Sequence, residues 1–229
     1  MLIESLASSS EGNCYIINMG KHRFMIEAGL SKPRIIKGTH NKLSQIEFCL
    51  LSHEHGDHSK SIKDLCKMGI DCYMSNGTAD YLAIEHHRVR RVSGPLSIGD
   101  LSIVPFAVKH DAVEPFGYLI YSLETKEKLL FATDTYFLPY EFKWLTHIMI
   151  ECNYSKDIFR KSDKADELLK RVVKSHFELE NVKDFLKKNK SEKLEEVYLM
   201  HLSDEGSDEA LFKSEIAGAV GVPVYVCGK

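Results

Sequence analysis

Apolar positions in the first fifty residues occur in short runs that alternate with turn-forming residues. The runs are rich in β-branched and aromatic side chains and cover 2–7, 14–18, 23–27 and 48–51. Small and polar residues cluster at 8–13, and a second turn signal falls at 18–21. Short runs of this kind, separated by such residues, are typical of strands joined by tight turns. This part of the chain is therefore predicted to be a meander that feeds a β-sheet.

A helical pattern follows directly after a run that is rich in histidine. Residues 59–68 carry apolar side chains at Ile62, Leu65, Cys66 and Met68. Their spacing of about three residues predicts a short amphipathic helix. The histidines before it are then expected in a loop that connects a strand to this helix.

The rest of the chain alternates between strand-like and helix-like patterns. Strands are predicted at 89–92, 101–108, 116–122, 128–132, 148–151, 196–200 and 222–226, and helices at 157–174, 179–188 and 208–219. Strands in both halves, with helices in the middle and at the end, predict an α/β fold in which two packed sheets are covered on the outside by helices. No linker divides the chain, so residues 1–229 are expected to form a single domain.

The composition agrees with a globular chain. Of its 229 residues, 44% are hydrophobic and 28% are charged, and the apolar runs are too short to span a membrane. The N-terminal residues lack the pattern of a secretory signal, and the six cysteines form no C-x-x-C pair, so we expect reduced thiols and a cytoplasmic location. The net charge of −3 neither favours nor excludes nucleic acid, and the pattern predicts no oligomeric state.

The densest group of chemically active side chains is the run His53-Glu54-His55-Gly56-Asp57-His58. An extended loop can turn His53 and His55 to one side, while Asp57 and His58 point to a neighbouring position. Imidazole nitrogens with a carboxylate are common ligands of zinc and related cations. The run therefore predicts two groups of metal ligands, and the alternative is a solvated polar loop.

Three more ligand candidates follow predicted strands directly. His110 comes after 103–108, Asp134 after 129–132 and His201 after 197–200. Loops at sheet ends bring distant side chains together on a rigid scaffold, so we expect these residues at the same site, with Asp134 bridging two metals. Taken singly, each also fits a turn cap or an ordinary hydrogen-bonded residue.

Two neighbouring cations hold a bridging hydroxide at neutral pH and clamp a phosphoryl or carbonyl oxygen, so this pattern predicts a hydrolase with two divalent metal ions. Zinc is expected first, and manganese or iron also suits these ligands. Asp57 is predicted to have a second role, because a ligating carboxylate beside the nucleophile can hold its proton and orient it.

The seven candidate ligands occur in an order and spacing that resemble the metallo-β-lactamase superfamily: His53, His55, Asp57, His58, His110, Asp134 and His201. The resemblance covers essentially the whole chain and implies an αββα sandwich, with two mixed β-sheets flanked by helices and the metals at one edge. Glu27 stands where the superfamily usually has Asp in an Asp-x-Gly turn, and Gly29 is kept. We expect Glu27 to accept hydrogen bonds from the loop.

Shorter motifs look like the YycJ/WalJ-type branch, which is bacterial or phage-encoded: residues 6–14, 109–112, 150–153 and 200–203. That resemblance implies a phosphodiesterase or exonuclease that acts on DNA or nucleotides. Asp134, where dinuclear lactamases tend to carry Cys, agrees with this. The stretch 135–200 leaves no room for the large extra domain of RNA-processing relatives.

His176 resembles the extra histidine of the nuclease branches and is predicted to be a catalytic acid, which donates a proton to the leaving oxygen or a hydrogen bond to the phosphate. Ser175 and Glu178 also have the spacing of a helix capping box, so a structural role is the alternative. For the whole chain, the alternatives are a hydrolase of small molecules such as cyclic nucleotides, thioesters or lactones, and a metal-binding module without catalysis.

Basic and aromatic residues near these positions are candidates for substrate recognition. They are Lys156, Arg160, Lys161, Lys164, Lys170, Arg171 and Lys174 in one predicted helical region, then His86, His87, Arg88, Arg90 and Arg91, and finally Tyr136 and Phe137. Lys and Arg can contact phosphates, and aromatic rings can stack on bases. A solvated helix of mixed charge and ordinary surface or core positions are the alternatives.

Overall fold

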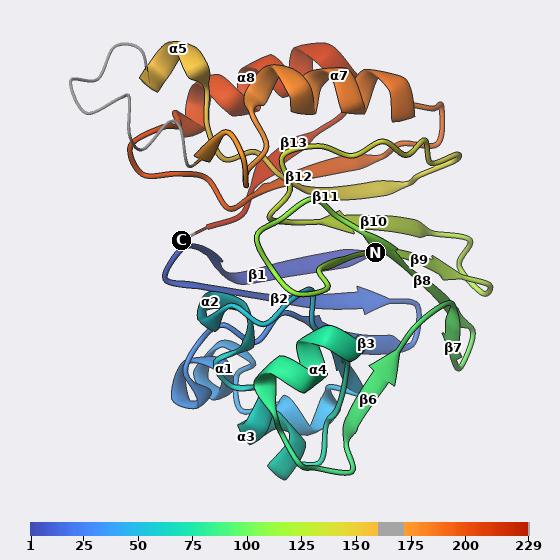
Figure 1. Ribbon diagram of the computed structural model, residues 1–229. Coiled ribbons are helices and arrows are strands. Elements are labelled where there is room, and N and C mark those ends of the chain that lie inside the picture. Colours follow the sequence, from blue (N-terminus) through green and yellow to red (C-terminus); the bar gives the residue numbers. More distant parts are fainter. Residues whose placement is uncertain (160–171, 229) are drawn as a thin grey trace. The chain divides into compact units, whose positions relative to one another are not determined.

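A computed structural model describes residues 1–159 and 172–228 of the chain (Figure 1). The strands form two mixed β-sheets, of six and seven strands, and helices accompany them. The predicted α/β class with two mixed sheets and flanking helices is confirmed. The chain divides into two compact units, of which one contains 1–107, 112–127 and residue 228, and the other contains 108–111 and 128–227.

The first unit holds nine strands, a 3-10 helix and four short α-helices within the described residues. In chain order they are β1 Leu2–Ser9, β2 Gly12–Met19, β3 His22–Ile26, α1 Lys32–Gly38, η1 Leu43–Gln45, β4 Phe48–Leu50, α2 Gly56–Ser59, α3 Ile62–Lys67, β5 Asp71–Ser75, α4 Asn76–Leu82, β6 Val89–Val92, β7 Leu96–Ile98, β8 Leu101–Ala107 and β9 Phe116–Ser122.

The six-stranded sheet of this unit has the order β1-β2-β3-β4-β5-β6. Its first three strands are antiparallel, as the predicted meander requires, and the pairs from β3 to β6 are parallel. Helices α1, α3 and α4 bury their apolar residues against the sheet, in one cluster that includes Ile35, Leu65, Cys72 and Ala79. Strands β7, β8 and β9 pair antiparallel in sequence order.

The helix predicted at 59–68 is divided in the structure. Helix α2 begins at Gly56 and ends at Ser59, and α3 begins only at Ile62. The backbone of Ala28 causes the interruption, because its N–H donates to the His58 carbonyl (2.7 Å) and its carbonyl accepts from the Ser61 N–H (2.9 Å). The expectation that all the histidines lie in a loop is therefore wrong for His58, which is part of a helical turn.

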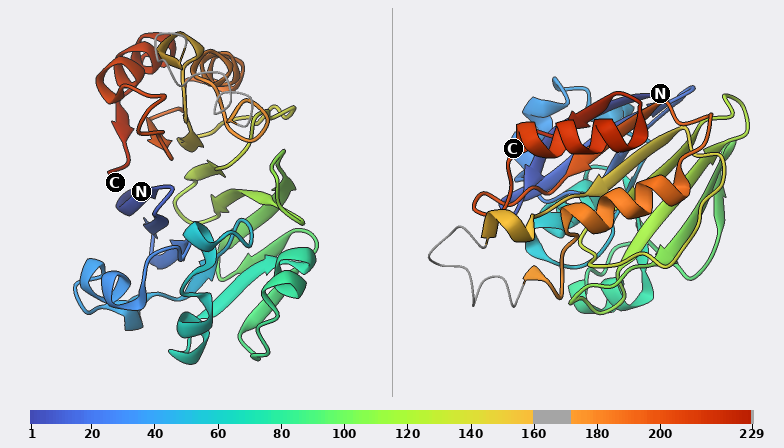
Figure 2. Two further views of the ribbon diagram at one scale, coloured as in Figure 1. Left: turned by 60° about the vertical axis from the view of Figure 1, so that its left-hand side comes forward. Right: turned by 90° about the horizontal axis from the view of Figure 1, so that it is seen from above.

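The second unit contains a parallel arrangement of strands and a pair of longer helices. Its elements are β10 Lys128–Ala132, β11 His147–Glu151, α5 Lys156–Phe159, α7 Leu179–Asn189, β12 Glu196–Met200, α8 Glu209–Val220 and β13 Val224–Val226. The strand order is β13-β12-β11-β10, with parallel pairing throughout. Helices α7 and α8 run side by side (Figure 2). They bury Phe185, Phe212 and Ile216 among other apolar residues.

One predicted helix of this unit falls largely outside the described residues. The prediction covered 157–174, of which the structure describes α5, whose last residue is Phe159, and then residues from Val172 onward. Residues 173–175 form a turn. Among the described residues, no helix is both long enough and apolar enough to cross a membrane.

A buried histidine joins two carboxylates in the first unit. The His22 imidazole lies 2.8 Å from Glu47 through Nδ1 and 2.8 Å from Asp100 through Nε2, and its side chain is 6% exposed. Burial alone lowers the pKa of His22, but the hydrogen bonds and charges of the two carboxylates outweigh this and raise it. The imidazole therefore links the start of β3 to the turn before β8.

Candidate metal centre

The loop after β4 brings two imidazole rings together in the first unit. His53 is buried, and its Nδ1 lies 2.8 Å from the Ser52 hydroxyl, which holds the ring in one orientation. Its Nε2 lies 3.1 Å from Nδ1 of His55. The two nitrogens are thus close enough to serve as neighbouring ligands of one cation.

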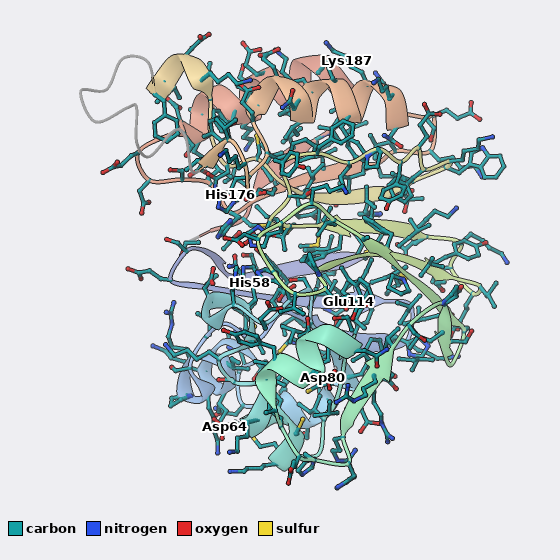
Figure 3. The ribbon with its side chains drawn as sticks, viewed as in Figure 1. His58, Asp64, Asp80, Glu114, His176 and Lys187 are labelled. Carbon is teal, nitrogen blue, oxygen red and sulfur yellow. The ribbon has the colours of Figure 1, made fainter. Side chains whose placement is uncertain are left out.

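His58 lies on α2 (Figure 3), and each of its ring nitrogens lies near a carboxylate. Its Nδ1 is 3.3 Å from Oε2 of Glu27, and its Nε2 is 3.2 Å from Oδ2 of Asp57. The Asn13 amide, which is fully buried, also lies 3.2 Å from Nε2. Each ring nitrogen of His58 thus lies near a carboxylate oxygen, and a buried carboxylate beside the histidine is typical of metal sites.

The turn at 27–29 positions this group. Glu27 is fully buried with φ at 66°, and its Oε1 accepts a hydrogen bond from the Ser52 N–H at 3.2 Å, as we expected of a Glu in the place of Asp. A Cβ on Gly29 would lie 1.6 Å from the Asp57 carbonyl oxygen. Only glycine therefore allows the turn to approach α2 so closely.

In the second unit, Asp134 and His201 follow the carboxyl ends of β10 and β12. Both are buried, and both adopt the left-handed backbone region, with φ of 46° and 54°. Residues other than glycine rarely adopt this conformation, which is frequent at functional sites. The turn places the Asp134 carboxylate 3.2 Å from Nδ1 of His201. Parallel strands end at the same edge, so these two residues meet there as predicted.

Glu151, the last residue of β11, connects this group. Its carboxylate is fully buried, and Oε1 accepts hydrogen bonds from Nδ1 of His176 (2.6 Å) and of His201 (3.0 Å). Oε2 accepts from the backbone N–H groups of Thr135 (3.0 Å) and Phe177 (3.2 Å). One carboxylate therefore orients both imidazoles and holds the two backbone segments beside them.

His110 belongs to the same group. Its Nδ1 donates to the Ser175 carbonyl at 3.3 Å, and its Nε2 lies 3.4 Å from Oδ2 of Asp134. The side chain is 4% exposed. The carbonyl fixes the hydrogen on Nδ1, so Nε2 is the nitrogen that can bind a cation.

His176, labelled in Figure 3, is held in place by Glu151, and its ring centroid lies 5.8 Å from that of His110 and 5.4 Å from that of His201. Burial lowers its pKa, but the charge and the hydrogen bond of Glu151 raise it by more. The N-cap of α7 is Glu178, whose side chain accepts from the Glu180 N–H, so the capping box built on Ser175 is not how this helix begins.

The donor atoms in each unit suit a divalent cation. Ligand atoms around a tetrahedral metal with bonds of 2.0–2.1 Å lie about 3.3 Å apart. The pairs described above, such as Asp57 Oδ2 with His58 Nε2 and His110 Nε2 with Asp134 Oδ2, lie 3.2 and 3.4 Å apart. Atoms of Asp134, Glu151, His176 and His201 lie within 4.8 Å of one another. Imidazole with carboxylate, each fixed by a buried partner, is the donor set of a metal hydrolase.

Sequence reasoning did not assign roles to Glu151 and Asn13. For Glu151 a signal was present, because it is a charged residue at the end of the buried run 148–151, the pattern that singled out His110, Asp134 and His201. Asn13 lies in a turn-forming segment, where Asn is common for local reasons. Its contact with His58 arises from tertiary packing.

The basic residues predicted to contact substrate differ in their surroundings. Arg88 and Arg90 share the Asp71 carboxylate at 2.9 and 3.2 Å, and Arg91 pairs with Asp80 at 2.7 Å. These ion pairs neutralise much of the positive charge of the three arginines. In the helical region, the predicted residues 160–171 lie outside the described part of the chain, and Lys156 lies 3.9 Å from Glu178.

The sequence is similar to a family of known proteins and to individual members with curated names. Residues 22–201 match the beta-lactamase superfamily domain. The chain belongs to this family. An exodeoxyribonuclease WalJ of Streptococcus pneumoniae is 26% identical over 227 residues, which cover 90% of this chain and 83% of the relative. An exodeoxyribonuclease YycJ of Bacillus anthracis is 23% identical over 93% of this chain and 86% of its own length.

Solved structures support the same fold. The metallo-β-lactamase fold protein YhfI of Bacillus subtilis has a TM-score of 0.75, with 14% identity over 99% of this chain and 97% of that one. At this identity the likeness concerns the fold. The predicted superfamily and the WalJ/YycJ branch are confirmed, and the fold together with the His and Asp clusters implies divalent metal ions.

Proposed function

We propose that this chain is a metal-dependent phosphodiesterase, most specifically an exonuclease that cleaves phosphodiester bonds in DNA or nucleotides. The proposed metal ligands are His53, His55, Asp57, His58, His110, Asp134 and His201. The relatives named exodeoxyribonucleases, which are similar over nearly the whole chain, support this choice among the reactions of the superfamily. Two divalent cations, with zinc first and manganese or iron as alternatives, suit the donor set.

The observation that carries the proposal is the position of His176. Its Nδ1 is fixed at 2.6 Å from Glu151, and the same carboxylate binds His201, a proposed ligand. Hydrolysis of a phosphodiester needs a proton for the leaving oxygen, and a histidine held by a buried carboxylate is a common donor of such a proton. His176 is thus the proposed proton donor, and it is held by the same carboxylate that supports His201.

The cation, Asp57 and His176 have different roles in the proposed reaction. A divalent cation lowers the pKa of bound water and stabilises negative charge on a phosphoryl oxygen. Asp57, which lies 3.2 Å from His58, supplies a carboxylate that binds the cation and accepts a proton from the attacking water. His176 donates a proton or a hydrogen bond on the side of the leaving group.

The test uses purified protein loaded with zinc or manganese. We expect hydrolysis of bis(p-nitrophenyl) phosphate and of short DNA, and a loss of turnover by about 10²- to 10⁴-fold in His176→Gln with unchanged metal content. His40→Gln, a change at an exposed histidine on another segment, is the matched control and should retain turnover. Absence of activity on these substrates and on cyclic nucleotides, or a fully active His176→Gln, would refute the proposal.

A parallel panel separates the alternatives. Turnover of a thioester, a lactone or a chromogenic lactam without phosphodiester cleavage would indicate a hydrolase of small molecules. An Asp57→Ala variant with its full biological effect would indicate a metal-binding module without catalysis.

The proposal also covers the domain organisation and the location of the protein. We infer one domain over residues 1–229, because the family match at 22–201 takes in parts of both compact units. We infer a cytoplasmic location from the six cysteines, which are all buried and form no disulfide, as is usual where thiols stay reduced.

A further inference from the structure

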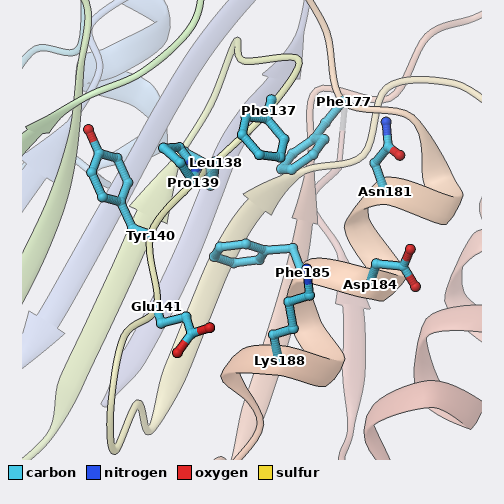
Figure 4. A pocket seen from close by; sticks show the side chains of 10 residues that line it. All are labelled: Phe137, Leu138, Pro139, Tyr140, Glu141, Phe177, Asn181, Asp184, Phe185 and Lys188. Atoms are coloured by element: carbon cyan, nitrogen blue, oxygen red, sulfur yellow. The ribbon is translucent and has the colours of Figure 1, made fainter.

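A small cavity lies beside the segment that carries His176. It has a volume of about 200 Å³ and is formed within the second unit. One wall is the segment 137–141 after β10, and the other is the first three turns of α7 (Figure 4). Phe177, the neighbour of His176, closes it at the end where Phe137 lies.

The cavity is lined by aromatic rings that differ in their exposure. Phe177 and Phe185 are 1% and 5% exposed, and their ring centroids are 6.3 Å apart. Phe137 and Tyr140, by contrast, are 52% and 37% exposed. The inner rings therefore belong to the core, whereas the outer rings offer flat apolar surface to solvent.

The polar residues around the rings restrict what can bind. Glu141 and Asp184 contribute two carboxylates, Lys188 contributes one ammonium group, and Asn181 contributes a neutral amide. An anionic phosphate is disfavoured in a lining with this charge balance. An uncharged aromatic ring that carries hydrogen-bonding edges matches both the flat apolar walls and the amide.

The cavity is tied to the proposed catalytic histidine by hydrogen bonds. The Oε2 atom of Glu151 accepts from the backbone N–H of Thr135 and from that of Phe177. The Thr135 hydroxyl in turn donates to the Phe137 carbonyl at 3.0 Å. The segments that carry Phe137 and Phe177 are thus held by the carboxylate that also binds His176.

We propose that this cavity is a subsite for a single unpaired nucleobase of the substrate. The inference rests on the proposed phosphodiesterase function and adds a specific contact to it. A volume of about 200 Å³ is below the roughly 300–1,000 Å³ of pockets for drug-sized ligands, so the cavity accepts one base and not a base pair. The base stacks on Phe137, the Asn181 amide bonds its edge, and the attached phosphate lies outside, toward His176.

The experiment measures cleavage of short single-stranded DNA whose terminal nucleotides are either intact or abasic at both ends. For wild type, the abasic ends should raise KM about tenfold, since stacking on one aromatic side chain strengthens the binding of a base by about this factor or more. Phe137→Ala should raise KM to a similar extent on the intact DNA, with kcat nearly unchanged, and should have no further effect on the abasic DNA.

Three further variants make the test specific. Phe137→Trp keeps a stacking surface and should restore KM. Asn181→Ala should raise KM on intact ends by less than Phe137→Ala. Trp144→Ala is the matched control, because Trp144 is a 60% exposed aromatic residue of the same unit that does not line the cavity. Phe137 is half exposed, so its truncation should leave the fold intact, as circular dichroism would verify.

A binding measurement that needs no turnover tests the subsite separately from the proposed phosphodiesterase function. A terminal 2-aminopurine should lose fluorescence when the oligonucleotide binds the metal-loaded wild type, and less so with Phe137→Ala. This result without any cleavage would keep the subsite and reject the proposed function. Cleavage in which Phe137→Ala affects intact and abasic DNA equally would overturn the subsite and leave the proposed function standing.

Discussion

Replacement of Glu151 by Gln tests whether this carboxylate sets the protonation of the histidines around it. Gln has the same shape but offers one oxygen and one NH₂ group. If the oxygen keeps the Thr135 and Phe177 N–H groups, the NH₂ faces Nδ1 of His176 and His201, at 2.6 and 3.0 Å in the wild type. Both imidazoles must then accept at Nδ1 and carry their hydrogen on Nε2, which removes Nε2 of His201 as a metal ligand.

The size of the effect follows from the bonds that change. Two charge-assisted hydrogen bonds are lost, and at about 1.5 kcal/mol each they sum to about 3 kcal/mol, or roughly 150-fold. Supporting groups of metal-bound histidines usually change affinity or activity by about 10- to 100-fold. We therefore expect Glu151→Gln to weaken metal binding by about 10- to 100-fold and to lower kcat/KM on bis(p-nitrophenyl) phosphate.

The assay is a competition for zinc against a chromophoric chelator, with unfolding of the metal-free protein measured in parallel. Glu178→Gln is the matched control, because Glu178 is a buried glutamate of the same unit whose carboxylate caps α7 and binds Lys156. An affinity of Glu151→Gln within twofold of wild type would refute the reasoning. So would an equal loss in Glu178→Gln, since that would indicate a general effect on stability.

Two further predictions concern stability in the first unit. His22→Gln should reduce the free energy of unfolding by about 2 kcal/mol at pH 5.5. Because the folded state raises the pKa of His22, its contribution is complete below the unfolded value of about 6.5 and is lost as the pH rises through the folded value. In urea unfolding, the difference in the free energy of unfolding between wild type and His22→Gln should therefore shrink as the pH rises through the folded-state pKa of His22. A difference that stays constant with pH would contradict this prediction. Gly29→Ala should cost about 3 kcal/mol or more, because its Cβ would lie 1.6 Å from the Asp57 carbonyl oxygen. Gly56→Ala, where a Cβ meets nothing within 4 Å, is the control, and equal costs for the two variants would contradict the steric argument.

The elements that could be predicted are those with a strong local pattern. β6, β9, β10 and β12 have the predicted bounds, because each is a run of β-rich residues between clear turn signals. β5, Asp71–Ser75, was not predicted, since its polar ends hide a strand that becomes stable only between β4 and β6. The short helices α1 and α4 were missed for a similar reason, because helices of seven residues depend on packing more than on propensity.

The same distinction applies to the candidate site. Residue type and position at strand ends were sufficient to select Asp134 and His201, and the structure brings these two together with His110 and His176. The orientation of the rings was not predictable, because it depends on partners far apart in sequence, such as Glu151 for His201 and Glu27 for His58. The sequence pattern of α2 likewise did not reveal that Ala28 interrupts the helix.

The sequence by itself determined the class of fold and the chemical identity of the proposed ligands, since both depend on residue types and on their spacing along strands. Tertiary structure alone decided how the histidine rings are turned, because the groups that hold them, such as Glu151 for His201 and the Ser175 carbonyl for His110, come from distant parts of the chain. It also decided that Phe137, a candidate for base stacking from the sequence, lies half exposed beside a cavity. Local patterns specify elements, whereas the contacts that orient a reactive side chain are made between elements.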